Sequence, residues 1–481
     1  MKTKNNQGKR HLIEALAFIA GARMLAPAFG TSIFVWTAQI CTVLVALALG
    51  YYYGGRHADS EDRMAQASKM LVYACATLAV SLFLSNIALL VSAVLGAKAG
   101  PFAFSAFLFF APCFFAGALT PIFLREYVEG MGSVGNDAGR IYAISTIGSL
   151  AGALVSAYVI VPFIGAKAGI FITAAVFGAL GICARPKMDL DKVAALAVLA
   201  ISLSSFVLAT AIFVPEGYAV TKEYDSEYFH IRIAENSEYK ILLMDADVHS
   251  RIRKGDAALV TEYTKQMAYA ADAYLNESGG AEGKKVALLG LGAGTLARHF
   301  AIEGAGTTAY EIDPAVLSVA KREFELQDMQ NLEVRVGDAR ELLSAGKNTC
   351  DALLIDAFAS RFSIPVHLAT REAFSGYRKS VGDGLLVMNI ISSAKGKRSE
   401  VFRSISSTAR EDFPYQAALT TNSDPEAIQN MVLIASARPF GGEYLGKIRS
   451  SGWAVLESWE NGTIYTDERS SIDYAMMGVL E

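Results

Sequence analysis

The sequence predicts an α-helical polytopic membrane domain followed by an α/β domain that carries a small N-terminal β cap. Three observations predict this class. The 481 residues are 53% hydrophobic and 19% charged, which is too apolar for a single soluble domain. The apolar excess ends near "FVPEGYAV", residues 213–220. Beyond that point, strand and helix signals alternate in a chain of ordinary soluble composition.

The first 215 residues carry apolar segments of the length that crosses a bilayer as a helix. They lie near residues 12–28, 32–53, 70–95, 102–124, 141–164, 168–184 and 193–214, which gives about seven segments. Within residues 71–124 the one charged side chain is Lys98. In the fifth segment, Gly148 and Gly152 form a G-x-x-x-G spacing, which we expect to pack within the bundle.

The remaining residues divide into the cap and the sheet. "EYFHIRIAENSEYKILLMD" (227–245) alternates in strand fashion across a polar turn, which is typical of an antiparallel hairpin. Further strand signals, each followed by a helix or a loop, lie in "KKVALLGLGAGTLARHFA" (284–301), "TTAYEID" (307–313), "LEVRVGDARELLSAG" (332–346), "DALLID" (351–356) and "GLLVMNII" (384–391). Alternation at this spacing predicts a parallel, doubly wound sheet.

Candidate binding residues follow the first four strands of this sheet. They are Gly290, Gly292, Gly294, Glu311, Asp338 and Asp356. Glycines in a strand-to-helix turn let the backbone approach a ligand closely, with a helix N-terminus beyond. Ligands of open α/β sheets bind at the carboxyl ends of the strands, where all three acids lie. A carboxylate at Glu311 suits a ribose diol and one at Asp338 an adenine amino group, so the pattern predicts a nucleoside site.

The motifs "VALLGLGAGTLARHF", "YEID", "VGDARELL" and "DALLIDAF", preceded by "LLMDADVHSRIRKGD", resemble the spermidine synthase (polyamine aminopropyltransferase) family over residues 224–440. That family belongs to the S-adenosylmethionine-dependent Rossmann-like proteins. The N-terminal half resembles the transporter-like bundle of bacterial membrane-fused forms. The resemblance implies a transmembrane bundle at 1–215, a β cap and substrate loop at 216–283, and a Rossmann-like catalytic domain at 284–481.

The resemblance also implies roles for single residues. The three glycines would line the donor nucleoside, Glu311 would hold its ribose, and Asp338 with Ala339 would bind the adenine. Asp356 matches the first aspartate of the family's D-x-x-D motif, so it would serve in deprotonating an attacking amine.

The sequence departs from the family where an amine is held. The second aspartate of D-x-x-D is Ala359, and the aspartate of the glycine turn is Ala293. The early glutamine falls at Phe229, the tyrosine after the cap falls at Val260, and residues 420–436 lack the late tyrosine. A buried ammonium without partners costs several kcal/mol. The departures therefore argue against an ordinary putrescine site.

Three functions fit these residues. The first is cleavage of the Cγ–S bond of S-adenosylmethionine or its decarboxylated form, with release of methylthioadenosine, by intramolecular attack or elimination. The second is aminopropyl transfer to a polyamine acceptor, with amine-holding groups recruited from Asp245, Asp247, His249 or Glu262. The third is a transporter or sensor whose soluble domain only binds the nucleoside.

The sequence also sets expectations for cofactors, partners and location. We expect no cofactor beyond the S-adenosylmethionine-type substrate, no metal and, at a net charge of -4, no nucleic acid. The lipid bilayer is the expected environment, and self-association as a homo-oligomer is compatible with the sequence. We expect a bacterial inner-membrane protein with a cytoplasmic catalytic domain, because the donor is made in the cytosol. The positive-inside rule applied to seven crossings gives the opposite side.

Overall fold

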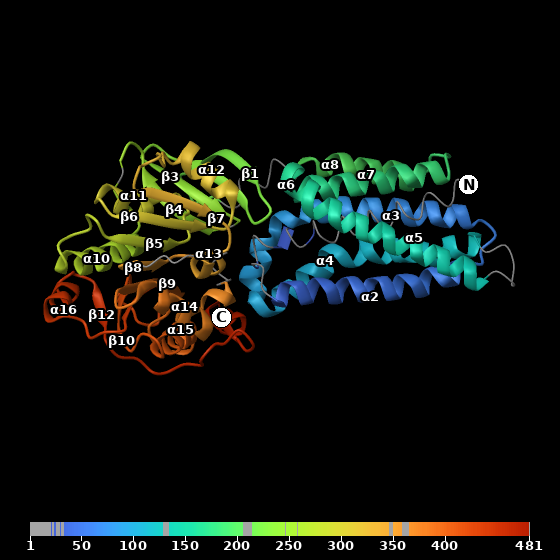
Figure 1. The fold of residues 1–481 in the computed structure, drawn as a ribbon. Coiled ribbons are helices and arrows are strands. Elements are labelled where there is room, and N and C mark those ends of the chain that lie inside the picture. The colour runs from blue at the N-terminus through green and yellow to red at the C-terminus, as the bar shows by residue number, and fades with distance from the viewer. Residues whose placement is uncertain are drawn as a thin grey trace. The chain divides into compact units, whose positions relative to one another are not determined.

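The computed structural model describes residues 21, 24, 25, 29, 33–127, 134–204, 214–245, 247–256, 258–345, 350–357 and 365–480 (Figure 1). The chain forms two compact units. The first comprises Met1–Val214 and Asp225–Phe229, and the second comprises Pro215–Tyr224 and His230–Glu481.

The first unit is helical. Its elements are α2 (Ile33–His57), α3 (Arg63–Leu84), α4 (Ala88–Tyr127), α5 (Val134–Val155), α6 (Val161–Ile164), α7 (Ala166–Ala184) and α8 (Leu190–Ser202). Among the described residues, five helices are long and apolar enough to cross a membrane. Many of their large apolar side chains face outward, among them Leu44, Ile147 and Leu150. Such a surface is what a bilayer would cover.

Of the seven predicted segments, two extend well outside the described residues and a third has different bounds in the structure. The predicted segment at 12–28 lies almost wholly outside the described residues, as does the end of the one at 193–214. The described part of the latter contains most of α8, which has 13 residues. The bounds predicted for the segment at 70–95 are wrong, because the candidate span is Arg63–Ile87. In this region α3 ends at Leu84, a 3-10 turn covers Ser85–Ile87, and α4 begins at Ala88. Hydropathy cannot locate this break, since apolar residues flank it on both sides.

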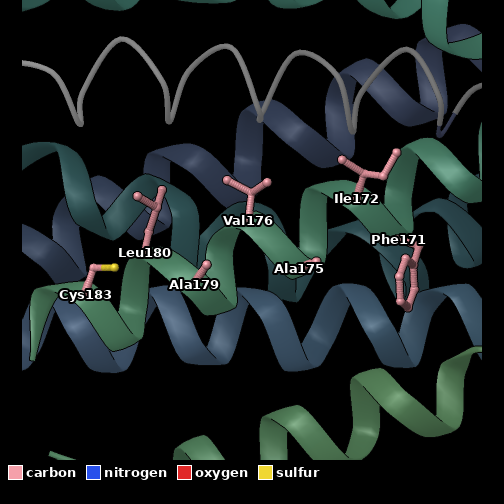
Figure 2. A pocket seen from close by; sticks show the side chains of 7 residues that line it. All are labelled: Phe171, Ile172, Ala175, Val176, Ala179, Leu180 and Cys183. Carbon is pink, nitrogen blue, oxygen red and sulfur yellow. The ribbon is translucent and has the colours of Figure 1, made fainter. Parts of the chain in front are cut away.

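Small residues let the helices approach closely. Gly50 and Gly54 of α2 face α4, where a Cβ on Gly54 would lie 2.1 Å from the carbonyl oxygen of Ala118. On α5, Gly148 and Gly152 are buried within the chain, as the sequence predicted for packing inside the bundle. Figure 2 shows a hollow along α7 whose lining is entirely apolar. Its residues are Phe171, Ile172, Ala175, Val176, Ala179, Leu180 and Cys183.

The second unit begins with the cap, a four-stranded sheet in the order β1-β2-β3-β4. The strands are β1 (Ala219–Asp225), β2 (His230–Glu235), β3 (Tyr239–Met244) and β4 (Asp247–Arg253). The predicted hairpin is β2–β3, which is antiparallel. The cap is tied to the larger sheet through Glu323, whose carboxylate accepts hydrogen bonds from Lys222 Nζ at 2.8 Å and Tyr224 Oη at 3.1 Å.

The larger sheet has eight strands in the order β12-β10-β11-β9-β8-β5-β6-β7. The strands are β5 (Lys285–Leu289), β6 (Gly306–Glu311), β7 (Leu332–Val336), β8 (Ala352–Ile355), β9 (Leu385–Ser392), β10 (Tyr415–Thr420), β11 (Gln429–Ser436) and β12 (Ala454–Leu456). Strands β5 to β9 are parallel, as predicted. The last three strands are antiparallel additions that the sequence analysis did not predict.

Helices cover both faces of this sheet, which confirms the doubly wound class (Figure 1). One hydrophobic core contains residues of α14 (Arg371–Val381), α15 (Glu400–Arg410) and α17 (Ile472–Leu480). The other contains residues of α10 (Glu262–Glu277), α11 (Thr295–Ile302) and α16 (Gly442–Arg449). Alternate residues of each strand enter opposite cores, so Leu353 and Ile355 join the first core and Leu354 the second. Two further helices, α12 (Pro314–Glu323) and α13 (Ala339–Ala345), follow β6 and β7.

Candidate active site

The glycine turn follows β5 at the point where the strand order reverses, with β6 on one side and β8 on the other. This reversal is where open α/β sheets bind ligands. Gly290, Gly292 and Gly294 have φ angles of 97°, 56° and 76°, a region that L side chains rarely adopt. A Cβ on Gly290 would also lie 2.3 Å from the carbonyl oxygen of Asp356. The turn therefore needs glycine for its conformation and for its approach to β8.

Ser250 of β4 holds this turn, and the sequence analysis did not identify it. Its Oγ accepts a hydrogen bond from the Ala293 amide at 3.1 Å. A Cβ on Gly292 would lie 2.7 Å from the same oxygen. The cap thus supports the glycine turn directly. A serine within a strand carries no local sequence signal for such a long-range contact.

Glu311 ends β6 and is 7% exposed. Its Oε2 accepts a hydrogen bond from the Leu291 amide at 3.1 Å, and its Oε1 accepts one from the Asp313 amide at 3.0 Å. Burial raises the pKa of Glu311, and these backbone donors oppose the rise. The side chain therefore faces the glycine turn, which is where the predicted ribose contact requires it.

Asp338 follows β7 and begins the turn into α13. Its Oδ1 accepts from the Glu341 amide at 3.0 Å, which caps α13, and its Oδ2 lies 2.8 Å from His367 Nε2. His367 belongs to the 3-10 turn Val366–Leu368 and was not singled out in the sequence. Ala339 is buried as the first residue of α13. Asp338, the predicted adenine contact, thus follows β7, which pairs with the strand that ends at Glu311.

Asp356 lies directly after β8 with both carboxylate oxygens engaged. Asn389 Nδ2 donates to Oδ1 at 2.9 Å, and Tyr263 Oη donates to Oδ2 at 3.2 Å. Burial raises the pKa of Asp356, and the two hydrogen bonds oppose the rise. The pKa of Tyr263 is raised well above its ordinary value by burial and then by the charge of Asp356. Neither partner carries a positive charge.

Tyr263 and Asn389 were both missed by the sequence analysis. The family's tyrosine after the cap was placed at Val260, where it is absent. Tyr263, three residues on and in the first turn of α10, brings a hydroxyl to the carboxylate instead. Asn389 lies among apolar residues in β9, so the sequence indicated that its side chain would be buried. A buried amide needs a hydrogen-bond partner, and this was the available signal for a role at the site.

The four residues proposed to hold an amine have separate environments. Asp245 is buried and accepts from the His230 amide at 3.1 Å, within the cap. Glu262 accepts from Trp453 Nε1 at 2.6 Å, and its side chain is 47% exposed. Asp247 and His249 lie on β4, where burial lowers the pKa of His249 to about 4, against the effect of Asp247. Of the four, His249 has its backbone carbonyl oxygen 3.4 Å from Tyr263 Oη, the hydroxyl that also lies 3.2 Å from Asp356 Oδ2.

Comparisons with known proteins show which proteins this chain resembles. A polyamine aminopropyltransferase from Vibrio vulnificus is 33% identical over 130 residues, which are 25% of this chain and 43% of that protein. The crystal structure of a probable spermidine synthase from Corynebacterium glutamicum covers 52% of this chain and 98% of its own, with 22% identity and a TM-score of 0.46. No family model matches the sequence.

A second curated relative belongs to another branch of transferases. An eEF1A lysine and N-terminal methyltransferase homolog from Drosophila melanogaster is 28% identical over 133 residues, which are 20% of that protein. The chain thus spans less than half the length of either curated relative. At the positions where the chain departs from the spermidine synthase family, the structure shows Ala293 as a buried methyl group. Ala359 lies outside the described residues.

Proposed function

We propose that the protein is a membrane-integrated, spermidine-synthase-like enzyme that breaks the Cγ–S bond of S-adenosylmethionine or its decarboxylated form and releases methylthioadenosine. The most direct version of this reaction transfers the aminopropyl group to an amine. In this proposal the carboxyl ends of β5, β6 and β7 bind the nucleoside, and Asp356 at the end of β8 acts on the reacting groups.

The observation that carries the proposal is the environment of Asp356. When ionised, a buried carboxylate whose two donors are neutral has a negative charge that neither donor balances. A cationic sulfonium donor or an ammonium acceptor would supply the missing charge. The backbone carbonyl oxygen of Asp356 also lies beside Gly290, so this residue is adjacent to the turn that would hold the nucleoside.

The transfer step balances without a further reactant. The ammonium form of the acceptor gives a proton to Asp356, which frees a nitrogen lone pair to attack Cγ of the donor and form a secondary ammonium product. The Cγ–S bond breaks with its electron pair moving to sulfur, which neutralises the sulfonium and releases methylthioadenosine. General-base assistance of this kind contributes about 10²–10⁴-fold to a rate.

A second candidate is cleavage within one bound molecule, and Ala359, at the second aspartate of the family's D-x-x-D motif, favours it. An alanine at that position cannot hold an acceptor amine as an aspartate would. In that reaction the carboxylate of S-adenosylmethionine itself attacks Cγ and leaves as a lactone, so no acceptor site is needed. Holding both groups in one molecule supplies the proximity that a second substrate otherwise requires.

The first unit would anchor this chemistry in a bacterial inner membrane, with the catalytic unit on the cytoplasmic side where the donor is made. The five candidate spans support the membrane location. The proposed partners are the donor, methylthioadenosine and the lipid bilayer. Pure nucleoside sensing or transport would not require a buried carboxylate beside the turn.

The test incubates the detergent-solubilised full-length chain with each donor, with and without putrescine, and quantifies the nucleoside products. The proposal predicts methylthioadenosine. Dependence on putrescine would identify transfer, whereas formation without any amine would identify intramolecular cleavage. If S-adenosylhomocysteine forms in place of methylthioadenosine, the enzyme is a methyltransferase and the proposal fails. It also fails if neither nucleoside forms.

A further inference from the structure

Two side-chain amides, those of Asn430 and Asn389, form a hydrogen-bonded chain that ends at the carboxylate of Asp356. Asn430 Nδ2 donates to Asn389 Oδ1 at 3.0 Å, and Asn389 Nδ2 donates to Asp356 Oδ1 at 2.9 Å. A carboxamide has an oxygen at one end and an NH2 group at the other. Because Asn430 occupies the oxygen, the NH2 group of Asn389 is directed to the carboxylate.

The sheet register builds this chain. Ile355 pairs with Met388 across the parallel strands β8 and β9, so Asp356 and Asn389 come next on both strands. Across the antiparallel strands β9 and β11, Asn389 pairs with Val432 and Ile391 with Asn430. Asn389 and Asn430 are therefore diagonal neighbours on one face of the sheet, within reach of long side chains. Asn389 is 3% exposed, so water does not replace a lost partner.

We propose that Asn389 and Asn430 are positioning residues for Asp356, forming a relay in which Asn430 fixes the Asn389 amide so that it donates to the carboxylate. Asn430 does not touch Asp356 in this arrangement and acts only through Asn389. The role of the relay in catalysis rests on the proposed function. The hydrogen bonds of the relay can be tested without measuring turnover.

The groups around Asp356 define what a titration would report. On α10 the titratable neighbour is Tyr263, which contacts the carboxylate. The carbonyl oxygen of His249 on β4 lies 3.4 Å from Tyr263 Oη, and Glu311 ends β6, which is two strands from β8 in the sheet. Burial, Asn389 and Tyr263 account for the shift in the pKa of Asp356. Loss of the Asn389 donor therefore raises that pKa further, because the charged form loses a hydrogen bond.

The sign for stability follows from this. An acid whose pKa is raised in the folded state destabilises that state as pH rises from the unfolded to the folded pKa. In Asn389→Leu the pKa of Asp356 in the folded state is higher than in the parent. The variant therefore continues to lose stability between the folded-state pKa of the parent and its own. Its deficit in melting temperature relative to the parent should therefore be smallest at acid pH, where Asp356 is protonated in both the folded and the unfolded state, and should grow as pH rises.

The experiment measures melting temperature against pH for full-length Asn389→Leu, Asn430→Leu and the double variant. We expect a pH-dependent deficit for each single variant, and a double variant no more pH-dependent than Asn389→Leu, because both changes break one chain. The matched control is Asn331→Leu, whose Nδ2 donates to the backbone oxygens of Ala301 and Ala305 outside the site. Its deficit should not vary with pH.

Repeating the series in an Asp356→Asn background separates the relay from a general structural role. With the carboxylate gone, the pH dependence should disappear. A deficit that is constant with pH, or a pH dependence that persists without Asp356, would overturn the relay.

Where turnover is measurable, the acid limb of its pH profile should move up by about one pH unit or more in Asn389→Leu, since a hydrogen bond to a charged group is lost. An unmoved limb would contradict the relay. Failure of the proposed function is a distinct result. In that case the parent forms no methylthioadenosine, while the pH-dependent deficit in melting temperature remains.

Discussion

Replacing Asp356 by asparagine is expected to lower turnover by about 10²–10⁴-fold while leaving nucleoside affinity unchanged. Asparagine keeps the shape of the side chain and can still accept from Asn389 or Tyr263 at its single oxygen. It removes the charge that faces a cationic substrate and the capacity to take a proton. Methylthioadenosine release under saturating donor, together with calorimetric titration of the product, measures the two quantities separately.

The matched control for this variant lies at the opposite end of the same strand. Asp351 precedes β8 and accepts from the Lys285 amide at 2.9 Å, with Lys284 Nζ 3.6 Å away. Asp351→Asn should leave turnover close to that of the parent. If Asp356→Asn retains turnover within about threefold of the parent, the carboxylate has a structural role, because a lost base predicts far more.

Replacing Glu311 by alanine is expected to weaken methylthioadenosine binding by roughly 10-fold to 150-fold. The estimate assigns about 1.5–3 kcal/mol to a charge-assisted hydrogen bond with the ribose. The variant also frees the amides of Leu291 and Asp313, so the glycine turn loses part of its support. Because these amides are buried, Glu311→Gln is a useful second variant: it keeps one acceptor oxygen and removes the charge.

The binding measurement is calorimetric titration of each variant, with a melting curve to show that it is folded. Glu333→Ala is the control, since Glu333 lies on β7, is 57% exposed and pairs with Arg335. Unchanged affinity in a folded Glu311→Ala variant would remove Glu311 from the nucleoside site and leave it as a support of the turn.

The parallel part of the fold was readable from the sequence because its strands are continuous apolar runs that end in glycine or an acid. "DALLID" is an example, with Leu353, Leu354 and Ile355 all buried and Asp356 at the strand tip. The antiparallel strands β10 and β11 were not predicted, because "TTNSDPEAIQ" (420–429) between them reads as a loop. Those strands matter for the site, since β11 carries Asn430.

The side chains that contact Asp356 could not be predicted from local sequence patterns. Tyr263 lies 93 positions from Asp356 and Asn389 lies 33 positions from it, and neither sits in a motif. Ser250 reaches the glycine turn across 43 positions. Such contacts are set by strand order and register, which one-dimensional periodicity does not encode. Strand-tip acids, by contrast, are positioned by the strands that precede them, so their common edge could be predicted.

The most direct test of the account is a cryo-EM map of the full-length protein with methylthioadenosine bound. The account predicts the ribose hydroxyls at Glu311, the adenine amino group at Asp338 beside Ala339, and the thioether sulfur directed toward Asp356. A nucleoside bound away from the glycine turn, or bound there with its sulfur directed away from Asp356, would contradict it.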